Sequence, residues 1–255
     1  MRIFLTGAAG GIGSEAAKKL VEDSHKVIAY DCDKEGLEQL PSSVKTYQGD
    51  IKDEERLNEV VRGEIFDTLV NCAGIQKQGA VEDMDIEDFR EHIEVNYIGA
   101  LNAVKAALPM IKERQGKIVN VSSVAGIYGA PFLGAYSGSK HAVEGVTESL
   151  RLELRASNVD VVLFEPGPVK TGFNEKGRTN LRNYVSNSPY SGEYESKLEE
   201  EPEGISPRKA GLELAKVVGK NSPRPRHSPT TRFHWLVKLR SLIPWRIREF
   251  FLGNR

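Results

Sequence analysis

The chain has 255 residues, which is enough to bury a substantial core in one large α/β domain or two small ones. Its 35 basic and 36 acidic residues leave a formal net charge of -1, so the overall charge gives no case for nucleic-acid binding. The two cysteines, Cys32 and Cys72, lie in strand-like runs, which predicts core thiols in a reduced, cytoplasmic protein with no metal site. The apolar run after Met1 is too short for a signal peptide, and no stretch reaches the roughly 20 apolar residues of a spanning helix.

Short apolar runs alternate with longer helical patterns from Arg2 to about Glu165. The apolar runs predict strands buried on both faces, and they are RIFLT (2–6), KVIAYD (26–31), DTLVNCAG (67–74), GKIVNVSS (116–123) and VDVVLFEPG (159–167). The intervening segments have apolar residues near helical spacing, and they span 13–24, 53–62, 85–114 and 138–157. This alternation predicts a Rossmann-type, doubly wound parallel sheet with helices on both faces, formed as a single domain.

The pattern changes after Thr171. Residues 172–206 are polar and short of periodic apolar positions, so they form either a lid over a site or a disordered insertion, and their place after a strand favours the lid. A Ser-Pro start signal predicts a further helix over 206–220. We assign residues 1–222 to the catalytic domain, lid included, and 223–255 to a C-terminal tail.

The tail, residues 223–255, mixes arginines and lysines with aromatic and aliphatic residues. This composition suits a helix that lies in a membrane interface, although Pro244 would break or kink it. A tail that docks on the protein body or on a neighbouring subunit explains the pattern equally well. The sequence therefore leaves peripheral membrane contact as one of two alternatives.

A glycine-rich turn joins the first predicted strand to the first predicted helix. Gly7, Gly11 and Gly13 are spaced G-x-x-x-G-x-G, which differs from the usual G-x-G-x-x-G fingerprint. Glycine permits left-handed backbone angles and close approach to a pyrophosphate, and the helix N-terminus offers free N–H groups to the phosphates. A strand, a glycine turn and a helix in this order predict dinucleotide binding.

Asp31 ends the second predicted strand, eighteen residues after Gly13. A carboxylate at this interval accepts hydrogen bonds from the adenosine ribose hydroxyls and repels a 2′-phosphate. Cys32 and Asp33 beside it supply no arginine for that phosphate, so we predict NAD(H) in preference to NADP(H). The alternative is that Asp31 only caps the next helix.

From residue 2 to about 173 the chain resembles the classical short-chain dehydrogenases/reductases. The matching segments are TGAAGGIG, GDI, NCAG with Cys72 in place of the family's second asparagine, EVNYIGA, IVNVSS, AYSGSK and EPGPVKT. Their order makes the resemblance specific. The later segments are more similar to the 17β-hydroxysteroid and retinol dehydrogenase subgroup, which implies an alcohol or ketone substrate that is bulky and lipophilic.

The resemblance implies a set of site residues. The catalytic set is Asn96, Ser123, Tyr136 and Lys140, with Ser123 chosen over Ser122 because it lies thirteen residues before the tyrosine. The cofactor set is Gly7, Gly11, Ile12, Gly13, Asp31, Asp50, Ile51, Asn71, Ala73, Gly74, Tyr136, Lys140, Pro166, Gly167, Val169 and Thr171. Cys72 departs from the motif at a position that supports the backbone, where no catalytic role depends on it.

Each catalytic residue type suits alcohol oxidation. Tyr136 would take the hydroxyl proton, and Lys140, one turn along a helix, would lower the pKa of the phenol, which is ordinarily about 10. Ser123 would hydrogen-bond the substrate oxygen, and Asn96 would hold a water that links Lys140 to solvent. The alternative interpretations are that Ser123 only caps the end of a strand and that Asn96 only makes a local hydrogen bond within a helix.

Two other classes of function use the same fold. An NAD(H)-binding regulatory or scaffold protein without turnover is one, although we would expect such a protein to lack the tyrosine or the lysine. A nucleotide-sugar epimerase or dehydratase is the other, but the segment after residue 172 is short for its substrate domain. Family members commonly form dimers or tetramers through the long helices, which here follow Asp83 and Tyr136, so we expect a homodimer or homotetramer.

Overall fold

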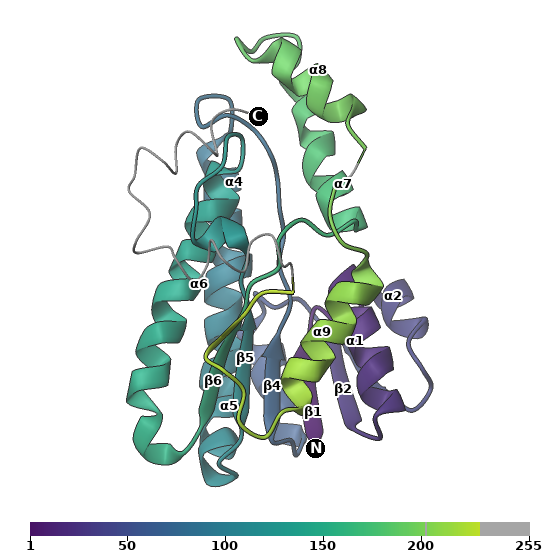
Figure 1. The fold of residues 1–255 in the computed structure, drawn as a ribbon, viewed down its shortest axis with the longest axis vertical. Coiled ribbons are helices and arrows are strands. Elements are labelled where there is room, and N and C mark those ends of the chain that lie inside the picture. The colour runs from purple at the N-terminus through teal and green to yellow at the C-terminus, as the bar shows by residue number, and fades with distance from the viewer. Residues whose placement is uncertain (202, 230–255) are drawn as a thin grey trace.

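A computed structural model describes residues 1–201 and 203–229. In this part of the chain, seven parallel strands form one sheet in the order β3-β2-β1-β4-β5-β6-β7 (Figure 1). The strands are β1 (Arg2–Thr6), β2 (Lys26–Asp31), β3 (Lys45–Gln48), β4 (Thr68–Asn71), β5 (Lys117–Val121), β6 (Asp160–Phe164) and β7 (Arg226–His227). The predicted Rossmann-type fold is confirmed, and all five predicted strands are present. The sequence missed β3 and β7, because neither contains an apolar run.

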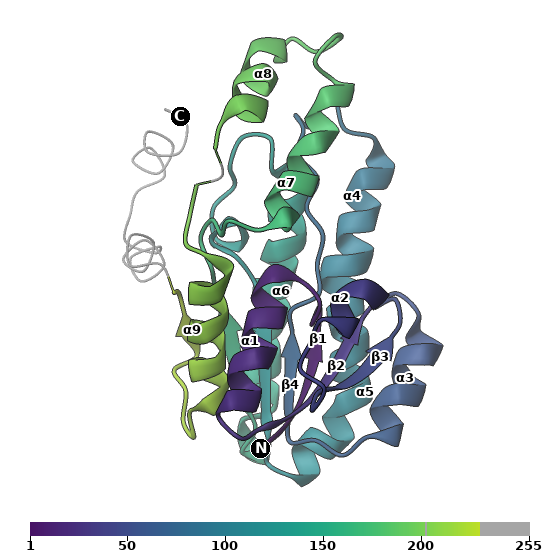
Figure 2. The same ribbon diagram turned by 90° about the vertical axis from the view of Figure 1, so that its right-hand side faces the viewer.

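Helices cover both faces of the sheet (Figure 2). They are α1 (Gly11–Glu22), α2 (Lys34–Glu38), α3 (Glu54–Gly63), α4 (Ile86–Ile93), α5 (Gly99–Glu113), α6 (Gly134–Glu153), α7 (Gly172–Thr179), α8 (Ser191–Glu199) and α9 (Pro207–Gly219). The helix predicted over 85–114 is divided into α4 and α5 by a π-helical turn, Glu94–Ile98. In the part of the chain that the structure describes, no helix is long and apolar enough to cross a bilayer.

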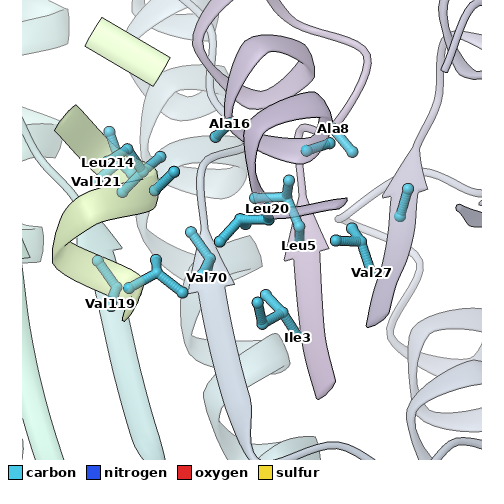
Figure 3. Close-up of a cluster of buried hydrophobic side chains, with 14 of the residues drawn as sticks. Ile3, Leu5, Ala8, Ala16, Leu20, Val27, Val70, Val119, Val121 and Leu214 are labelled. Atoms are coloured by element: carbon cyan, nitrogen blue, oxygen red, sulfur yellow. The ribbon is translucent and has the colours of Figure 1, made fainter. Parts of the chain in front are cut away.

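Alternating side chains of each strand enter two separate cores. Ile3 and Leu5 of β1 face α1 and α9, and Leu214 of α9 packs in the same cluster (Figure 3). Phe4, between them in sequence, points to the opposite face, where it packs with residues of α3 and α5. Since both faces of the central strands are covered, most of their side chains are apolar, and a buried polar one such as Asn120 of β5 is hydrogen-bonded to Thr147.

The predicted lid is helical. Residues 172–206 were expected to be a lid or a disordered insertion, and the structure instead forms α7, a 3₁₀ turn at Asn180–Asn183, and α8 above the carboxyl ends of the strands (Figure 1). Tyr194 of α8 is fully buried, and its hydroxyl bonds Asp83 and accepts the Ala80 N–H at 2.8 Å. Arg178 donates to the Glu200 carbonyl at 2.7 Å beyond the end of α8. These long-range contacts order a segment whose sequence has no helical period.

The domain extends past its predicted end at residue 222, because β7 pairs with β6 four residues later. Arg226 of β7 forms ion pairs with Glu144 and Glu165, and a third with Glu148 at 2.8 Å. Glu165 is completely buried just after β6, and Glu144 and Glu148 lie on α6. The first residues assigned to the tail thus belong to the sheet, while residues 230–255 of the predicted tail lie outside the described residues.

The buried Glu165 makes stability depend on pH. Burial, followed by the neighbouring Glu144, raises the pKa of Glu165 to about 8. The folded state therefore keeps a proton that the unfolded chain releases near pH 4.5, so this contribution favours folding below that pH and is lost as the pH rises toward 8. We expect Glu165→Gln to match the parent protein near pH 5 and to exceed its free energy of unfolding at pH 8 by on the order of 1 kcal/mol or more.

Urea denaturation at the two pH values measures the effect. Glu213→Gln removes a carboxylate from an exposed pair with Lys216 and serves as the control, for which we expect no such crossover. A Glu165→Gln variant that lost stability equally at both pH values would contradict the assignment.

Candidate active site

A large cavity, of about 1600 Å³, opens where the parallel strands end. It extends from the turn after β1 across the ends of β4 and β5 to the lid helix α7. Connections run outward from β1 and from β4 in opposite directions along the sheet, and this switch point is where open α/β sheets bind ligands. The volume exceeds the roughly 300–1,000 Å³ typical of a pocket for one small ligand. The cavity has room for a dinucleotide and a second molecule together.

The glycine turn fits a dinucleotide at one end of the cavity. Gly7 has φ +66°, and a Cβ there would lie 2.4 Å from the Ala73 nitrogen. A Cβ on Gly13 would lie 2.1 Å from the Gly7 carbonyl oxygen. The first helical hydrogen bond runs from the Ser14 N–H to the Gly10 carbonyl at 2.7 Å, so the N–H groups of residues 11–13 precede the bonded ladder. The backbone can pack this closely only because glycine has no side chain. The free N–H groups at the start of α1 are then available to bind a pyrophosphate.

Asp31 lies beside this turn, half-buried at the end of β2. One carboxylate oxygen accepts the Ala9 N–H at 2.9 Å and the other the Asp33 N–H at 3.0 Å. The cap of α2 is Asp33, whose side chain accepts the Gly36 N–H, so the alternative role considered for Asp31 is wrong. Tyr30 donates to the Asp50 carbonyl at 3.1 Å and thereby anchors the neighbouring predicted cofactor residue.

Three of the four predicted catalytic side chains meet in the centre of the cavity wall. Ser123 follows β5, whereas Tyr136 and Lys140 lie one turn apart on α6, and all three line the cavity. Ser123 hydrogen-bonds Tyr136, and its hydroxyl also accepts the Ala125 N–H at 3.1 Å. The Lys140 ammonium donates to the Val121 carbonyl at 2.9 Å and lies 5.8 Å from the centre of the Tyr136 ring.

Burial dominates the ionisation of this group. It raises the pKa of Tyr136 to about 12, opposed by the bond from Ser123, and it lowers the pKa of Lys140 to about 8. The sequence predicted that Lys140 would bring the pKa of the phenol below its ordinary value, and in this structure the opposite shift prevails. The reason is that a phenolate in a dry cavity loses its hydration, while the ammonium is turned toward a backbone carbonyl.

The two predicted asparagines do not line the cavity. Asn96, in the π-helical turn, accepts the Ile75 N–H at 2.7 Å and donates to the Ile75 carbonyl at 3.0 Å and to Ser139. It therefore holds a stretch of cavity wall. Asn71 is buried at the end of β4 and donates to the Asn120 side chain at 2.9 Å, which ties β4 to β5. Its neighbour Cys72 keeps its backbone bond to β1, so the departure from the family motif leaves that link intact.

The remaining predicted cofactor residues all line the cavity. They are Gly7, Gly11, Ile12, Gly13, Asp31, Asp50, Ile51, Ala73, Gly74, Pro166, Gly167, Val169 and Thr171. In the described part of the chain, no group of His, Cys, Asp or Glu side chains could hold a metal ion. The structure therefore gathers most of the predicted set around one cavity, although its members come from six separate loops.

The other end of the cavity has apolar walls and a charged mouth. Tyr128, Phe132 and Leu133 line this part of the cavity, and so does Phe173 of α7. Phe132 has φ +64°, a strained value for a bulky residue, and its ring packs edge-on against Tyr194 at 5.1 Å. The charged mouth residues are Lys77, Glu91, Lys176, Arg178, Lys197, Glu200, Glu201 and Glu203.

Sequence reasoning missed two side chains that contact Tyr136. The ring of Phe173 lies edge-on at 6.0 Å between ring centres, and that of His92 at 6.5 Å. His92 lies four residues before Asn96, so both occupy one face of a helix, and that spacing was a usable signal. Phe173 had no such signal, because only the folded lid brings it to the site.

The fold and the cavity together define a nicotinamide-dinucleotide-binding oxidoreductase of the Rossmann type. The family model described as short chain dehydrogenase matches residues 1–182. The chain is 34% identical to a 3-ketodihydrosphingosine reductase of Bacteroides thetaiotaomicron, with 87% of this chain and 84% of the relative covered. It is 33% identical to retinol dehydrogenase 8 of Bos taurus, with 95% and 85% covered.

A solved structure supports the same assignment. A short chain dehydrogenase from Burkholderia cenocepacia in complex with NADP superposes with a TM-score of 0.79 at 25% identity, covering 100% of this chain and 98% of that one. The chain therefore belongs to the short-chain dehydrogenase family, whose members are nicotinamide-dependent oxidoreductases.

Proposed function

We propose that the protein transfers a hydride between NAD(H) and a secondary alcohol or ketone, with Tyr136 as the acid–base. The observation that carries this proposal is the group of Ser123, Tyr136 and Lys140 around one cavity that also contains the glycine turn. A regulatory protein without turnover has no need for a buried tyrosine and lysine at the same cavity. We therefore favour an enzyme over a dinucleotide sensor or scaffold.

The side chains divide the work of the reaction. When bound, the oxidised nicotinamide accepts the hydride and brings a positive charge that favours the phenolate. Ser123 donates to the substrate oxygen and limits the charge that develops there. Tyr136 receives the hydroxyl proton of an alcohol or returns it to a ketone. Lys140, with a pKa lowered to about 8 by burial, exchanges protons near neutrality and can pass one on from the phenol.

The substrate we propose is lipophilic and bulky, with a polar end. Apolar side chains line the cavity close to Tyr136, whereas lysines and glutamates lie at its mouth. An amphiphilic substrate would place its reacting carbon among the apolar side chains and its polar group among the lysines and glutamates. The relatives named as reductases of 3-ketodihydrosphingosine and as retinol dehydrogenases support this class, which includes steroid, retinoid and fatty substrates.

Removal of the Tyr136 hydroxyl tests the assigned acid–base. We expect Tyr136→Phe to lower kcat by on the order of 10²–10⁴-fold, because the proton then has no acceptor. NADH affinity, followed by nicotinamide fluorescence, should stay within about 3-fold, since the ring itself remains. The assay is a screen of steroids, retinoids and simpler alcohols followed by NADH absorbance.

Tyr47→Phe is the matched control for this experiment, because Tyr47 lies on β3 and lines no part of the cavity. Unchanged turnover in the Tyr136→Phe protein would refute the role of Tyr136. A parent protein that bound NADH but turned over no substrate would refute the enzymatic function itself.

We further propose that the enzyme prefers NAD(H) to NADP(H). The Asp31 carboxylate lies beside the glycine turn, and Cys32, Asp33 and Asp50 around it supply no cation for a 2′-phosphate. We expect kcat/KM to favour NAD by at least about 10-fold, and the double variant Asp31→Ser, Cys32→Arg to reverse the preference. Steady-state kinetics with both cofactors measure it, and a parent enzyme that favours NADP would overturn the proposal.

We also propose that two copies of the chain pair through α5 and α6. Leu101 of α5 and Val146 of α6 are partly exposed, and they line a small hollow together with the buried Val104 and Leu150. A second copy would remove that apolar surface from water. We expect light scattering to give the mass of a dimer or tetramer, and Val146→Glu to give a monomer, whereas a monomeric parent protein would contradict the pairing.

A further inference from the structure

His92 is a buried titratable group that the proposed reaction does not use. It lies in the last turn of α4 with none of its surface exposed. Its neighbours come from two other parts of the fold, the cavity wall through Lys77 and α6 through Tyr136, and from Asp88 on its own helix. His92 is therefore a buried imidazole in direct contact with the ring of the proposed acid–base, Tyr136.

The partners of His92 define its protonation. Nδ1 lies 2.6 Å from the Asp88 carbonyl oxygen, which can only accept, so Nδ1 carries the hydrogen. Nε2 lies 3.0 Å from the Lys77 backbone nitrogen, which can only donate, so Nε2 carries a lone pair. The ring is therefore the neutral Nδ1–H tautomer. A second proton on Nε2 would set two donors against each other.

His92 and Asn96 together hold one stretch of the cavity wall. Asn96 bonds both the N–H and the carbonyl of Ile75, and His92 accepts the N–H of Lys77 two residues later. The Lys77 ammonium adds ion pairs to Asp88 at 2.6 Å and Glu91 at 2.7 Å on the same helix. The wall from Ile75 to Lys77 is thus attached to α4 and its π-helical turn by both backbone and side chain.

The same imidazole supports the Tyr136 ring. His92 meets that ring at an interplanar angle of 68°, and Phe173 of the lid meets it at 66°. Phe173 belongs to a separate helix at the cavity mouth, whereas His92 belongs to a helix continuous with the π-helical turn and α5. His92 is accordingly the ring contact that does not depend on the lid.

We propose that His92 is a positioning residue for the reaction: the neutral imidazole fixes the Lys77 end of the cavity wall and orients the Tyr136 ring, so that turnover requires it uncharged. This proposal rests on Tyr136 being the acid–base. Burial is the main cause that lowers the pKa of His92, with Lys77 acting in the same direction and the Asp88 carbonyl bond, Asp88 and Glu91 opposing it.

The direction of the pH effect follows from that lowered pKa. The folded state keeps His92 neutral at pH values where the unfolded chain already binds a proton, so its contribution to stability is present above about pH 6.5 and declines as the pH falls below it. Turnover should decline at lower pH, where the folded protein itself protonates His92, because Nε2 can then no longer accept the Lys77 N–H.

Two substitutions remove the ring, and only one of them replaces its hydrogen bonds. His92→Gln keeps a carbonyl oxygen to accept from Lys77 and an amide to donate to Asp88, but it does not titrate. His92→Leu keeps bulk and leaves the Lys77 N–H without its acceptor. We expect kcat to fall by on the order of 10- to 100-fold in His92→Leu and to stay within about 3-fold in His92→Gln. Because glutamine does not titrate, the decline of kcat at acid pH that His92 causes should be absent in His92→Gln.

His141→Gln is the matched control, because His141 is exposed on α6 and also bonds a carbonyl one turn back, that of Ser137. NADH affinity should stay within about 2-fold in all three variants, since the imidazole lies away from the glycine turn. Parent-like kcat in His92→Leu, or equal losses in His92→Gln and His92→Leu, would overturn the proposal. A fall of kcat in His92→Leu that is accompanied by an equal fall in NADH affinity would also overturn it.

A readout without substrate completes the test. Long-range ¹H–¹⁵N NMR of the imidazoles in the parent protein should report the Nδ1–H tautomer for His92 at pH 7 and a titration midpoint below the ordinary histidine value. The Nε2–H tautomer, or titration at the ordinary histidine value, would refute the assignment. If the parent protein turned over no substrate, the proposed function would fail, while this spectrum would still decide whether His92 holds Lys77.

Discussion

The whole structure depends on a sheet that is buried on both faces. Ile3 and Leu5 enter one core while Phe4 enters the other, and β2, β4, β5 and β6 repeat this alternation. Such a sheet leaves little room for charge in its interior, so the polar side chains that could bind a ligand lie at the ends of the strands. Because all seven strands are parallel, their carboxyl ends coincide, and one edge collects the glycine turn, Asp31, Ser123 and the residues that follow Glu165.

Electrostatics at this edge are governed by desolvation. The pKa of Tyr136 is raised and that of Lys140 is lowered by the same burial, so each side chain is driven toward its neutral form. Near neutral pH the Tyr136 phenol is therefore uncharged while Lys140 still carries most of its proton, so the two side chains do not form an ion pair.

Several residues predicted from the sequence lie together in the structure because the spacing within a short motif already specifies the local geometry. A glycine spacing specifies a turn that side chains would fill, and Tyr136 and Lys140 share a helix face whatever surrounds them. The lid could not be predicted in the same way. Its helices lack apolar periodicity and are held by single long-range contacts, such as Tyr194 with Asp83 and Ala80, which sequence spacing does not reveal.

The sequence by itself determined the parallel α/β fold and the glycine turn after β1, and it predicted most of the residues that line the cavity, because each of these is encoded within a short segment. Only the tertiary structure decided that β7 extends the sheet, that Asn96 grips Ile75 instead of lining the cavity, and that His92 and Phe173 flank Tyr136. The sign of the Tyr136 pKa shift also belongs to this second group. The physical reason is that burial and ring contacts are sums over residues far apart in the chain, and they exist only once the chain is packed.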